Sequence, residues 1–524
     1  MSFPELIDAA IDSILNLVPG LTALLIDNHT SDLLTSYMPL SELLSKSVCL
    51  THNISNEIES SKMTNTPCVV LIKPCIDSVR QLASHLKNPI FRSYTIVFCN
   101  KVARNLLEML ATLDVKKSII GVHEFFLDFM LYNSNTFHLG VKGTFFTKKT
   151  LNQLVEKLHT VFSTLLLKPT IFFQKHTVCA PVFGRSLINS FSDTLTRDLV
   201  HGPRLVIVDR VFDMVCPLLI PWSYEGLIHH LWGINKHRTT VGGLTHILRD
   251  DFFLENATVN FGELNRVMCS RISTMKSREN EIKQLNSEVA TTGETDALKQ
   301  IFLDVDDLNE QSNRIAHHAV IVSELNKEVE SKKYLEFSNV QQSLLLELMA
   351  SKELHETVCR LLENPFVSPY EKLSLIGLYV ASDSADNAYI LEFRDLFISI
   401  HPLLENVCNV LIDKMRQSKE ARGFLSRISR RFESFDNILT AYTPKIVGVV
   451  EEIIQNKTPS AFSLTGTQHK WNNSVVVFFI GGVTMLEIEA LSALKEKYPD
   501  VDVMVGSNEI LNMEGFLNNI MDSL

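Results

Sequence analysis

Residues 475–487 read VVVFFIGGVTMLE, and this stretch decides the fold. Its first six residues are all apolar, which is typical of a strand buried on both faces. Gly481 and Gly482 then turn the chain, and Thr484 followed three positions later by Glu487 is a capping-box pattern that opens a helix. A buried strand, a tight turn and a helix in this order indicate a βαβ unit and a parallel sheet.

The same kind of pattern occurs at both ends of the chain. Further β-rich apolar runs lie at Leu21–Ile26, Val69–Ile72, Thr95–Cys99, Thr170–Phe173, Leu205–Val208 and Val501–Val505. Helical patterns separate them, including one that a capping-box pattern at Thr150–Gln153 is expected to open. Because a sheet that begins before residue 230 resumes after residue 470, we expect one α/β domain interrupted by a large insertion.

The insertion is charged and has helical periodicity. Two apolar stripes run along it, the first at Leu264, Met268, Ile272 and Met275, and the second at Ile315, Ala319, Val322, Leu325 and Val329. The segment Ser287–Thr295 between them is polar and contains a glycine. We therefore expect two long amphipathic helices joined by a polar turn, forming a helical hairpin that protrudes.

Composition places the chain among ordinary globular proteins and limits its functions. It has 524 residues, 45% of them hydrophobic, and a net charge of -11. This charge repels a polyanion, so nucleic-acid binding is not expected as the main activity. The N-terminus does not resemble a signal peptide, and residues 475–483, the longest apolar stretch near the end, are far short of the ~20 residues that a membrane span needs. We expect a cytoplasmic protein that contacts membranes only through partners.

Metal-binding patterns are weak. The nine cysteines are scattered without a CxxC pair, which predicts reduced thiols. His123-Glu124 and His355-Glu356 each begin a zinc-protease pattern, but neither has a second histidine four positions after the first. A group of further histidines, including the adjacent pair His317 and His318, is expected to be structural, because neighbours on a helix point about 100° apart. The remaining members of that group are His229, His230, His237 and His246. No metal or cofactor is expected.

Catalytic motifs are likewise missing from the sequence: it has no Walker loop, no GxGxxG after a strand and no nucleophile elbow. Two features leave an alternative open. Asp209 and Asp213 follow an expected strand, where carboxylates either bind metals or form a cap and ion-pair cluster. Gly481 and Gly482 either hold a phosphate through their N–H groups or make a tight turn where no side chain fits. A nucleotide- or sugar-handling enzyme with its site near Asp209 and Gly481 is therefore the alternative to a binding protein.

Residues 205–235, LVIVDRVFDMVCPLLIPWSYEGLIHHLWGIN, strongly resemble the SM family, the Sec/Munc-type proteins that bind syntaxins. The residues that carry the resemblance are Asp209, Arg210, Asp213, Pro217, Leu218, Trp222 and Tyr224. Residues 475–487 resemble the C-terminal signature of the family, and residues 437–444 resemble a segment before it. IPWSY at 220–224 and GIN at 233–235 look most like the vacuolar-protein-sorting branch, which works between Golgi and endosome. The chain departs from the family pattern at Cys216, where a hydroxyl residue is common, and in having no proline between Phe302 and Gln311.

The resemblance implies a fold and a domain plan. The fold is an arch of two parallel-sheet α/β domains with a large helical domain inserted in the second. The expected boundaries are 1–137 for the first α/β domain, 138–230 and 467–524 for the two parts of the second, and 231–466 for the helical domain, with its hairpin at about 261–329. The resemblance also implies that one residue set is a structural signature and not a catalytic site: Asp209, Arg210, Asp213, Pro217, Tyr224, Gly481 and Gly482.

The resemblance further implies a partner and a mechanism. Members of the family bind a short N-terminal syntaxin peptide in an apolar pocket on the first domain, which here corresponds to Leu107, Leu110, Ile119, Ile120 and Val122. The hairpin would hold SNARE helices in register during assembly, through Ile315, Val322, Leu325 and Val329. The expected protein is a monomeric, non-enzymatic regulator of vesicle docking and membrane fusion in Golgi, endosomal and vacuolar transport. It would bind a syntaxin-type SNARE and the assembling SNARE bundle.

Overall fold

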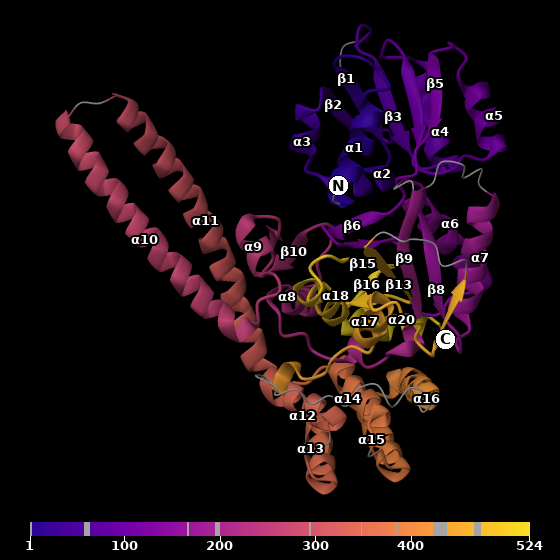
Figure 1. Cartoon of the computed structure of the whole chain (residues 1–524), viewed down its shortest axis with the longest axis vertical. Coiled ribbons are helices and arrows are strands. Elements are labelled where there is room, and N and C mark those ends of the chain that lie inside the picture. The colour runs from indigo at the N-terminus through magenta and orange to yellow at the C-terminus, as the bar shows by residue number, and fades with distance from the viewer. Residues whose placement is uncertain are drawn as a thin grey trace.

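The computed structural model describes residues 3–56, 63–164, 167–193, 200–292, 295–346, 348–383, 385–422, 438–465 and 473–523. Figure 1 shows a first α/β domain in indigo and violet at the top and a second α/β domain in the middle. Helices of the insertion lie below the second domain, and a long helical pair extends away from it. The expected arch of two α/β domains with a helical insertion is thereby confirmed.

The first domain contains a five-stranded parallel sheet in the order β2-β1-β3-β4-β5. Its strands are β1 (Thr22–Ile26), β2 (Val48–Asn53), β3 (Cys68–Ile72), β4 (Tyr94–Phe98) and β5 (Ile119–Glu124). The three central strands, β1, β3 and β4, are buried at every residue, as their uninterrupted apolar runs predict. The sequence did not reveal β2 and β5, because these two edge strands contain fewer apolar residues than the central strands.

Helices cover both faces of this sheet. They are α1 (Phe3–Leu15), α2 (Asn28–Tyr37), α3 (Leu40–Ser45), α4 (Ile76–Lys87) and α5 (Arg104–Leu113). Alternate residues of β1 enter two different cores, because side chains along a strand point to opposite faces. Ala23 and Leu25 pack with α4 and α5, whereas Leu24 and Ile26 pack with α1 and α2 in a core that continues into the second domain.

The second domain contains a seven-stranded sheet in the order β12-β8-β9-β13-β15-β7-β6. Its strands are β6 (Met130–Asn133), β7 (Thr136–His138), β8 (Leu167–Gln174), β9 (Val200–Asp209), β12 (Phe462–Thr465), β13 (Ser474–Ile480) and β15 (Asp502–Ser507). In the middle of the sheet, β9 pairs in parallel with β13, and β13 pairs in parallel with β15. The prediction that the sheet resumes after a long insertion is correct.

The sheet also includes strands that the sequence placed elsewhere. β7 pairs with β15, so the expected boundary at 137/138 cuts through a strand that belongs to the second sheet. β12 lies before the expected boundary at 466/467, yet it pairs antiparallel with β8. Both strands are short, and each pairs with an edge that the longer strands of the sheet leave open.

The helices around the second sheet are α6 (Lys148–Thr164), α7 (Cys179–Asp193), α8 (Tyr224–Trp232), α17 (Ile446–Ile454), α18 (Met485–Ser492), α19 (Leu494–Lys497) and α20 (Met513–Asp522). Two short 3-10 helices, η1 (Arg210–Phe212) and η2 (Cys216–Leu218), follow β9. A two-stranded sheet of β14 (Val483–Thr484) and β16 (Ile510–Leu511) lies beside α18 and α20. Thr484 caps α18 in a complete capping box with Glu487, as predicted. The capping box expected at Thr150 is wrong, because α6 already begins at Lys148.

In its described residues up to Arg422, the insertion is helical apart from one small hairpin, β10 (Arg238–Val241) and β11 (Leu244–Ile247). Its helices are α9 (Asp251–Asn256), α10 (Phe261–Thr292), α11 (Thr295–Ser331), α12 (Tyr334–Leu346), α13 (Ser351–Glu363), α14 (Pro369–Ala381), α15 (Asn387–Ile400) and α16 (Glu405–Arg422). In Figure 1, α10 and α11 lie side by side and project from the body. α10 extends to Thr292, so most of the segment expected to be a polar turn is helical. The resembling segment at 437–444 begins outside the described residues.

Candidate functional site

Arg210 is the centre of the family-like signature, and the chain buries it almost completely, at 1% exposed. Its two terminal nitrogens donate to Glu487, from Nη1 to Oε2 at 2.7 Å and from Nη2 to Oε1 at 2.6 Å. The same nitrogens also reach the carbonyls of Gly482 and Asp213. Burial favours the neutral form of Arg210, but the adjacent carboxylate outweighs it and raises the pKa of the guanidinium. This pair therefore joins the first part of the second domain to its last fifty residues by two parallel, charge-assisted hydrogen bonds.

Glu487 has two roles that the sequence showed only in part. Its N–H and carboxylate complete the capping box with Thr484, and the same carboxylate accepts both bonds from Arg210. A capping-box spacing can be read from sequence, whereas a partner 277 positions away cannot. Removing one partner of such a buried pair leaves an unpaired charge, which typically costs about 3–5 kcal/mol.

The two aspartates beside Arg210 are used by the backbone around them. Asp209 accepts from the N–H groups of Val211 and Cys179, both at 3.3 Å, and burial raises its pKa. Asp213 accepts from Val215 N at 3.0 Å and from the Tyr442 hydroxyl at 2.8 Å. These contacts are those of a cap cluster that fixes the loop after β9.

The glycine pair at 481 and 482 makes a tight turn whose N–H groups are already bonded. Both groups donate to Oδ1 of Asn508 at 2.8 Å, and the Asn508 amide donates in turn to the carbonyls of Val141 and Gly143. Both glycines have φ near +95°, and a Cβ on Gly482 would lie 2.3 Å from Leu511. Only glycine fits here, and the backbone donors that a phosphate would need are engaged by a side chain of the chain itself.

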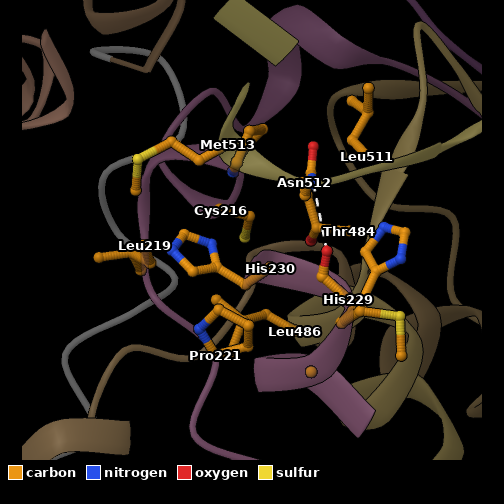
Figure 2. Close-up of a pocket in the computed structure, with 13 residues that line it drawn as sticks. Cys216, Leu219, Pro221, His229, His230, Thr484, Leu486, Leu511, Asn512 and Met513 are labelled. Carbon is orange, nitrogen blue, oxygen red and sulfur yellow. Dashed lines mark hydrogen bonds between the residues drawn. The ribbon is translucent and has the colours of Figure 1, made fainter. Parts of the chain in front are cut away.

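The cavity beside this turn is small. Figure 2 shows it between the loop after β9 and the segment that follows β16, with His229, His230, Leu219 and Met513 around it. Its volume is about 20 Å³, which is room for about one water molecule. The dashed contact in the figure is the Asn512 amide donating to the carbonyl of His229 at 3.1 Å. A nucleotide or a sugar does not fit in this space.

Two other signature residues contribute to packing. Pro217 lies in η2, which contacts α14 and α20. Tyr224 is fully buried, and its hydroxyl is 2.8 Å from Nδ1 of His318. The structure therefore brings Arg210, Asp213 and Gly482 together at one seam and places Tyr224 in the core of the helical domain.

The five residues expected to bind a syntaxin peptide lie on α5 and β5, at the outer edge of the first sheet (Figure 1). Leu107, Ile120 and Val122 are exposed, at 37%, 66% and 41%. Leu110 is buried at 2% exposed, and Ile119 packs partly buried against the same core. Exposed branched side chains therefore occur both on α5 and on the edge strand β5. Leu110 instead faces the sheet from α5 and belongs to the core between them.

The four hairpin residues expected to contact SNAREs are all buried in the helical domain. Ile315, Val322, Leu325 and Val329 are at most 9% exposed and belong to the largest core of the chain. They lie in the part of α11 that is packed against the body. Farther out, nearly every residue of α10 from Cys269 to Glu281 is exposed. The accessible surface of α10 over these residues is mostly polar, and the apolar stripe of α11 attaches the hairpin to the body.

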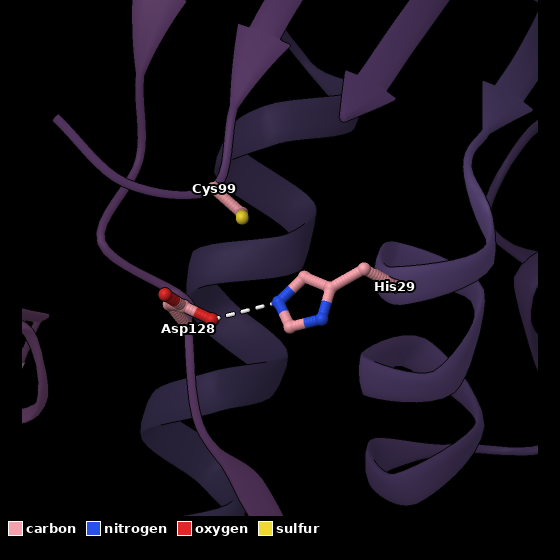
Figure 3. Close-up of side chains that lie close together, drawn as sticks. All are labelled: His29, Cys99 and Asp128. Atoms are coloured by element: carbon pink, nitrogen blue, oxygen red, sulfur yellow. Dashed lines mark hydrogen bonds and ion pairs between the residues drawn. The ribbon is translucent and has the colours of Figure 1, made fainter. Parts of the chain in front are cut away.

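A further cluster that the sequence did not reveal connects the first two domains. Figure 3 shows Asp128, from the link between the sheets, facing His29 of α2 and Cys99. Asp128 Oδ1 is 2.7 Å from His29 Nε2 and 2.6 Å from Nζ of Lys157 on α6. Burial acts to raise the pKa of Asp128, but His29 and Lys157 hold it at about 2. Asp128 follows the strand β5 in the chain, and its partners come from 99 positions earlier and 29 positions later, so local sequence does not reveal them.

The residues from 22 to 519 match the Sec1 family, and this chain belongs to that family of SM proteins. Relatives named vacuolar protein sorting-associated protein 45 match nearly the whole chain. The rat protein is 24% identical and the match covers 96% of this chain and 93% of the relative; the Saccharomyces cerevisiae protein is 24% identical, with 95% and 93% covered. A Sec1 family transport protein, SLY1 of Encephalitozoon cuniculi, is 22% identical over 95% and 94%. The resemblance to the vacuolar-protein-sorting branch is thereby confirmed.

Solved structures of SM proteins share this fold. The SM protein Vps45 in complex with the Qa SNARE Tlg2 superposes with a TM-score of 0.84 over 100% of this chain and 98% of that one, at 24% identity. Sly1p in complex with an N-terminal peptide of Sed5p has a TM-score of 0.78, at 17% identity, and covers 100% and 98%. Among the residues that the structure describes, no helix is both long and apolar enough to cross a bilayer.

Proposed function

We propose that this protein is a non-catalytic, monomeric regulator of vesicle docking and membrane fusion that binds a syntaxin-type SNARE and templates SNARE assembly. It would act from the cytoplasm on Golgi and endosomal membranes, in vacuolar protein transport, and would reach those membranes through its partners. Membership of the Sec1 family and whole-chain similarity to Vps45 and Sly1p, which were solved with a Qa SNARE and a SNARE peptide, support this role.

The observation that carries the proposal is the exposure of three apolar side chains on α5 and β5. Leu107, Ile120 and Val122 are exposed there, whereas most apolar residues of the first domain fill its two cores. We infer that the three side chains form one apolar surface. One bulky apolar side chain of a peptide anchored on such a surface is an ordinary recognition mode. The open edge of β5 offers backbone groups beside it.

The signature at the seam supports the non-catalytic part of the proposal. The carboxylates of Asp209 and Asp213 and the N–H groups of Gly481 and Gly482 are hydrogen-bonded within the chain. A substrate would have to displace these contacts and separate the two parts of the second domain. The rival assignment, a nucleotide- or sugar-handling enzyme, therefore has no preformed site at these residues.

The test is calorimetric titration of the whole chain with N-terminal peptides of each syntaxin of the same organism. We expect saturable binding of one peptide and its loss in Ile120→Arg and Leu107→Arg, because a buried arginine on the peptide face is left without a counter-charge. These two side chains are exposed, so the variants keep the fold. Leu110→Arg would disrupt the core of the first domain and is not a suitable test.

The matched control is Leu391→Arg, a helix residue of α15 that is 47% exposed and lies in the helical domain. It should bind the peptide like the unmodified chain. If no peptide binds, or if all three variants bind equally well, the peptide surface on α5 and β5 is refuted. Binding of an assembled SNARE bundle would then have to be measured with the hairpin as the contact.

A further inference from the structure

Four positions after His355, where a zinc-protease pattern would have its second histidine, the chain has Cys359. Both residues lie on α13, and residues four apart share one face of a helix. The adjacent helix α15 contributes Glu392 to the same place. The sequence does not reveal this group, because the zinc-protease pattern requires a histidine at position 359 and because Glu392 is distant along the chain.

The three ligand atoms surround one point. Nε2 of His355 is 3.0 Å from Oε2 of Glu392 and 3.7 Å from Sγ of Cys359, and all three atoms lie within 4.8 Å of one another. With Zn–N and Zn–O distances near 2.0–2.1 Å and Zn–S near 2.3 Å, tetrahedral ligands are separated by about 3.3–3.6 Å. The two separations from His355 Nε2 differ from these by roughly 0.4 Å or less, and Sγ of Cys359 lies within 4.8 Å of the Glu392 oxygen. The carboxylate is 53% exposed and can adjust by this amount.

The histidine ring is held in position by its neighbours. It lies 4.1 Å from the ring of Tyr389 and stacks on Phe393 at 5.3 Å, both from α15. Phe393 is fully buried, whereas the side chain of His355 is 18% exposed. The site therefore has a fixed imidazole, an adjustable carboxylate and access to solvent, which leaves a fourth position for water.

Two other groups of potential ligands in the described part of the chain are less suitable. In the group of His29, Cys99 and Asp128 (Figure 3), the ammonium of Lys157 already lies 2.6 Å from the carboxylate and would repel a second cation. In the group of Asp250, His317 and His318, the ring of His318 has no free nitrogen for a metal ion. One of its nitrogens is hydrogen-bonded with Tyr224 and the other with Asp250.

We propose that His355, Cys359 and Glu392 form a binding site for a zinc ion that joins α13 to α15. Imidazole, thiolate and carboxylate are the ligand types that zinc takes in proteins, and water completes the set. On binding, the Zn–S bond forms as the thiol proton passes to solvent, and Nε2 binds through its lone pair with the ring proton on Nδ1. Because the thiol and the imidazole must both be deprotonated to bind the ion, binding should weaken as the pH falls.

The experiment is titration of the whole chain with Co²⁺, a spectroscopic substitute for Zn²⁺, followed by displacement with Zn²⁺. We expect one ion per chain, visible bands of a tetrahedral site and a thiolate-to-cobalt charge-transfer band that zinc abolishes. Cys359→Ser should remove the charge-transfer band, and His355→Asn should weaken zinc binding by about 100-fold or more, since even second-shell changes cost 10–100-fold. Glu392→Gln, at an exposed position, gives a third variant that keeps the fold.

Cys269→Ser is the matched control, because Cys269 is an exposed free thiol on α10. It should leave the cobalt spectrum unchanged. A spectrum without the charge-transfer band, or zinc binding that survives both Cys359→Ser and Glu392→Gln, overturns the proposal. Loss of the band in Cys269→Ser would move the site to α10 and overturn it as well.

Discussion

At the scale of single residues, one buried carboxyl makes the stability of the fold depend on pH. Glu225 in the first turn of α8 is 8% exposed, and burial raises its pKa to about 7. α8 packs against α18, where burial raises the pKa of Glu489 to about 8. The exposed fraction of Glu489 shows that its side chain is only partly buried, so Glu225 gives the clearer prediction.

The sign follows from the protons bound in each state. Between pH 4.5 and about 7 the folded chain keeps the Glu225 proton while the unfolded chain loses it, so stability falls as the pH rises through this window. Glu225→Gln removes this titration. Between pH 4.5 and pH 8, the free energy of unfolding of this variant should rise by about 2–4 kcal/mol relative to that of the unmodified chain. Thermal unfolding midpoints at the two pH values measure the effect, as a few degrees in a chain of this size. Glu356→Gln, on the exposed side of α13, is the control; equal pH dependence in both variants would contradict the prediction.

The opposite burial of two leucines on α5 shows what the sequence alone could not predict. The resemblance implies that Leu107 and Leu110 share one peptide pocket, and residues three apart do lie on one side of a helix. The structure exposes Leu107 and buries Leu110. Side chains three apart differ by about 60° around the helix axis, and only the position of the sheet decides which of them points inward. The same limit hid the partner of Arg210, which comes from the far end of the chain.

At the scale of elements, the hairpin is the feature with the clearest consequence. α10 has 32 residues and α11 has 37, so they are about 48 Å and 55 Å long. Arg278 of α10 and Asp307 of α11 form an exposed ion pair across the two helices, at 3.6 Å. Since surface pairs contribute little, this pair adds little to the stability of the hairpin, whose shape depends on the continuity of each helix.

Asn280→Pro, at an exposed position in the middle of α10, should kink that helix locally and leave the body intact. Proline removes one helical hydrogen bond and clashes with the preceding turn, at a cost of about 3 kcal/mol. We expect normal syntaxin-peptide binding, an unchanged midpoint of thermal unfolding of the body and a loss of the acceleration of SNARE assembly. Assembly is followed by fluorescence transfer between labelled SNAREs, with Asn280→Ala as the control. Full activity of the proline variant would show that the outer hairpin is not the template.

Elements were predicted best where the local signal was complete. The buried strands β1, β3, β4, β9 and β13 were predicted because apolar runs flanked by turn residues identify them. The capping pattern at Thr484 was right and that at Thr150 was wrong, although both have the same spacing, because Thr147 and not Thr150 lies just before the helix and accepts from the Thr150 N–H at 3.4 Å. β2, β5 and β12 could not be predicted, since an edge strand is defined by the neighbour that it pairs with.

At the scale of the whole molecule, the first domain is attached to the insertion by a small polar joint. Arg249 donates to the carbonyls of Ser36 and Tyr37 at 3.1 and 3.0 Å, at the end of α2, and Lys236 pairs with Asp32. A cation at a helix C-terminus satisfies carbonyls that have no partner in the helix. A cleft of about 770 Å³ adjoins this joint and is lined from both sides.

Arg249→Ala should loosen the joint without unfolding either side. Unpaired buried carbonyls cost about 1–3 kcal/mol, so hydrogen exchange at the end of α2 should accelerate by about tenfold or more, and solution scattering should show a broader range of domain arrangements. Arg238→Ala is the control, because Arg238 lines the same cleft but is exposed. Identical exchange and scattering in the two variants would show that the joint does not depend on Arg249.

Two apolar signatures far apart in the chain were enough to predict the arrangement of the domains. They were not enough to predict the domain boundaries. Nothing in the sequence at Thr136–His138 shows that these three residues pair with β15, which lies more than 360 positions later. Long-range pairing is decided by which edge is open when the chain compacts, and local patterns carry no signal for it.

The pairing of β9 with β13 also sets the order of events during synthesis. About 265 residues separate the two strands, so a ribosome needs roughly 13 to 50 s to deliver the second after the first. Until then a nascent chain has β9 without its parallel neighbour and Arg210 without Glu487. The insertion, whose contacts are mostly local, can complete its helices in that interval, whereas the sheet has a high contact order and closes last. A chain cut short by even its final fifty residues would keep β9 paired with β8 on one side and open on the other, and such an exposed edge is a template for aggregation.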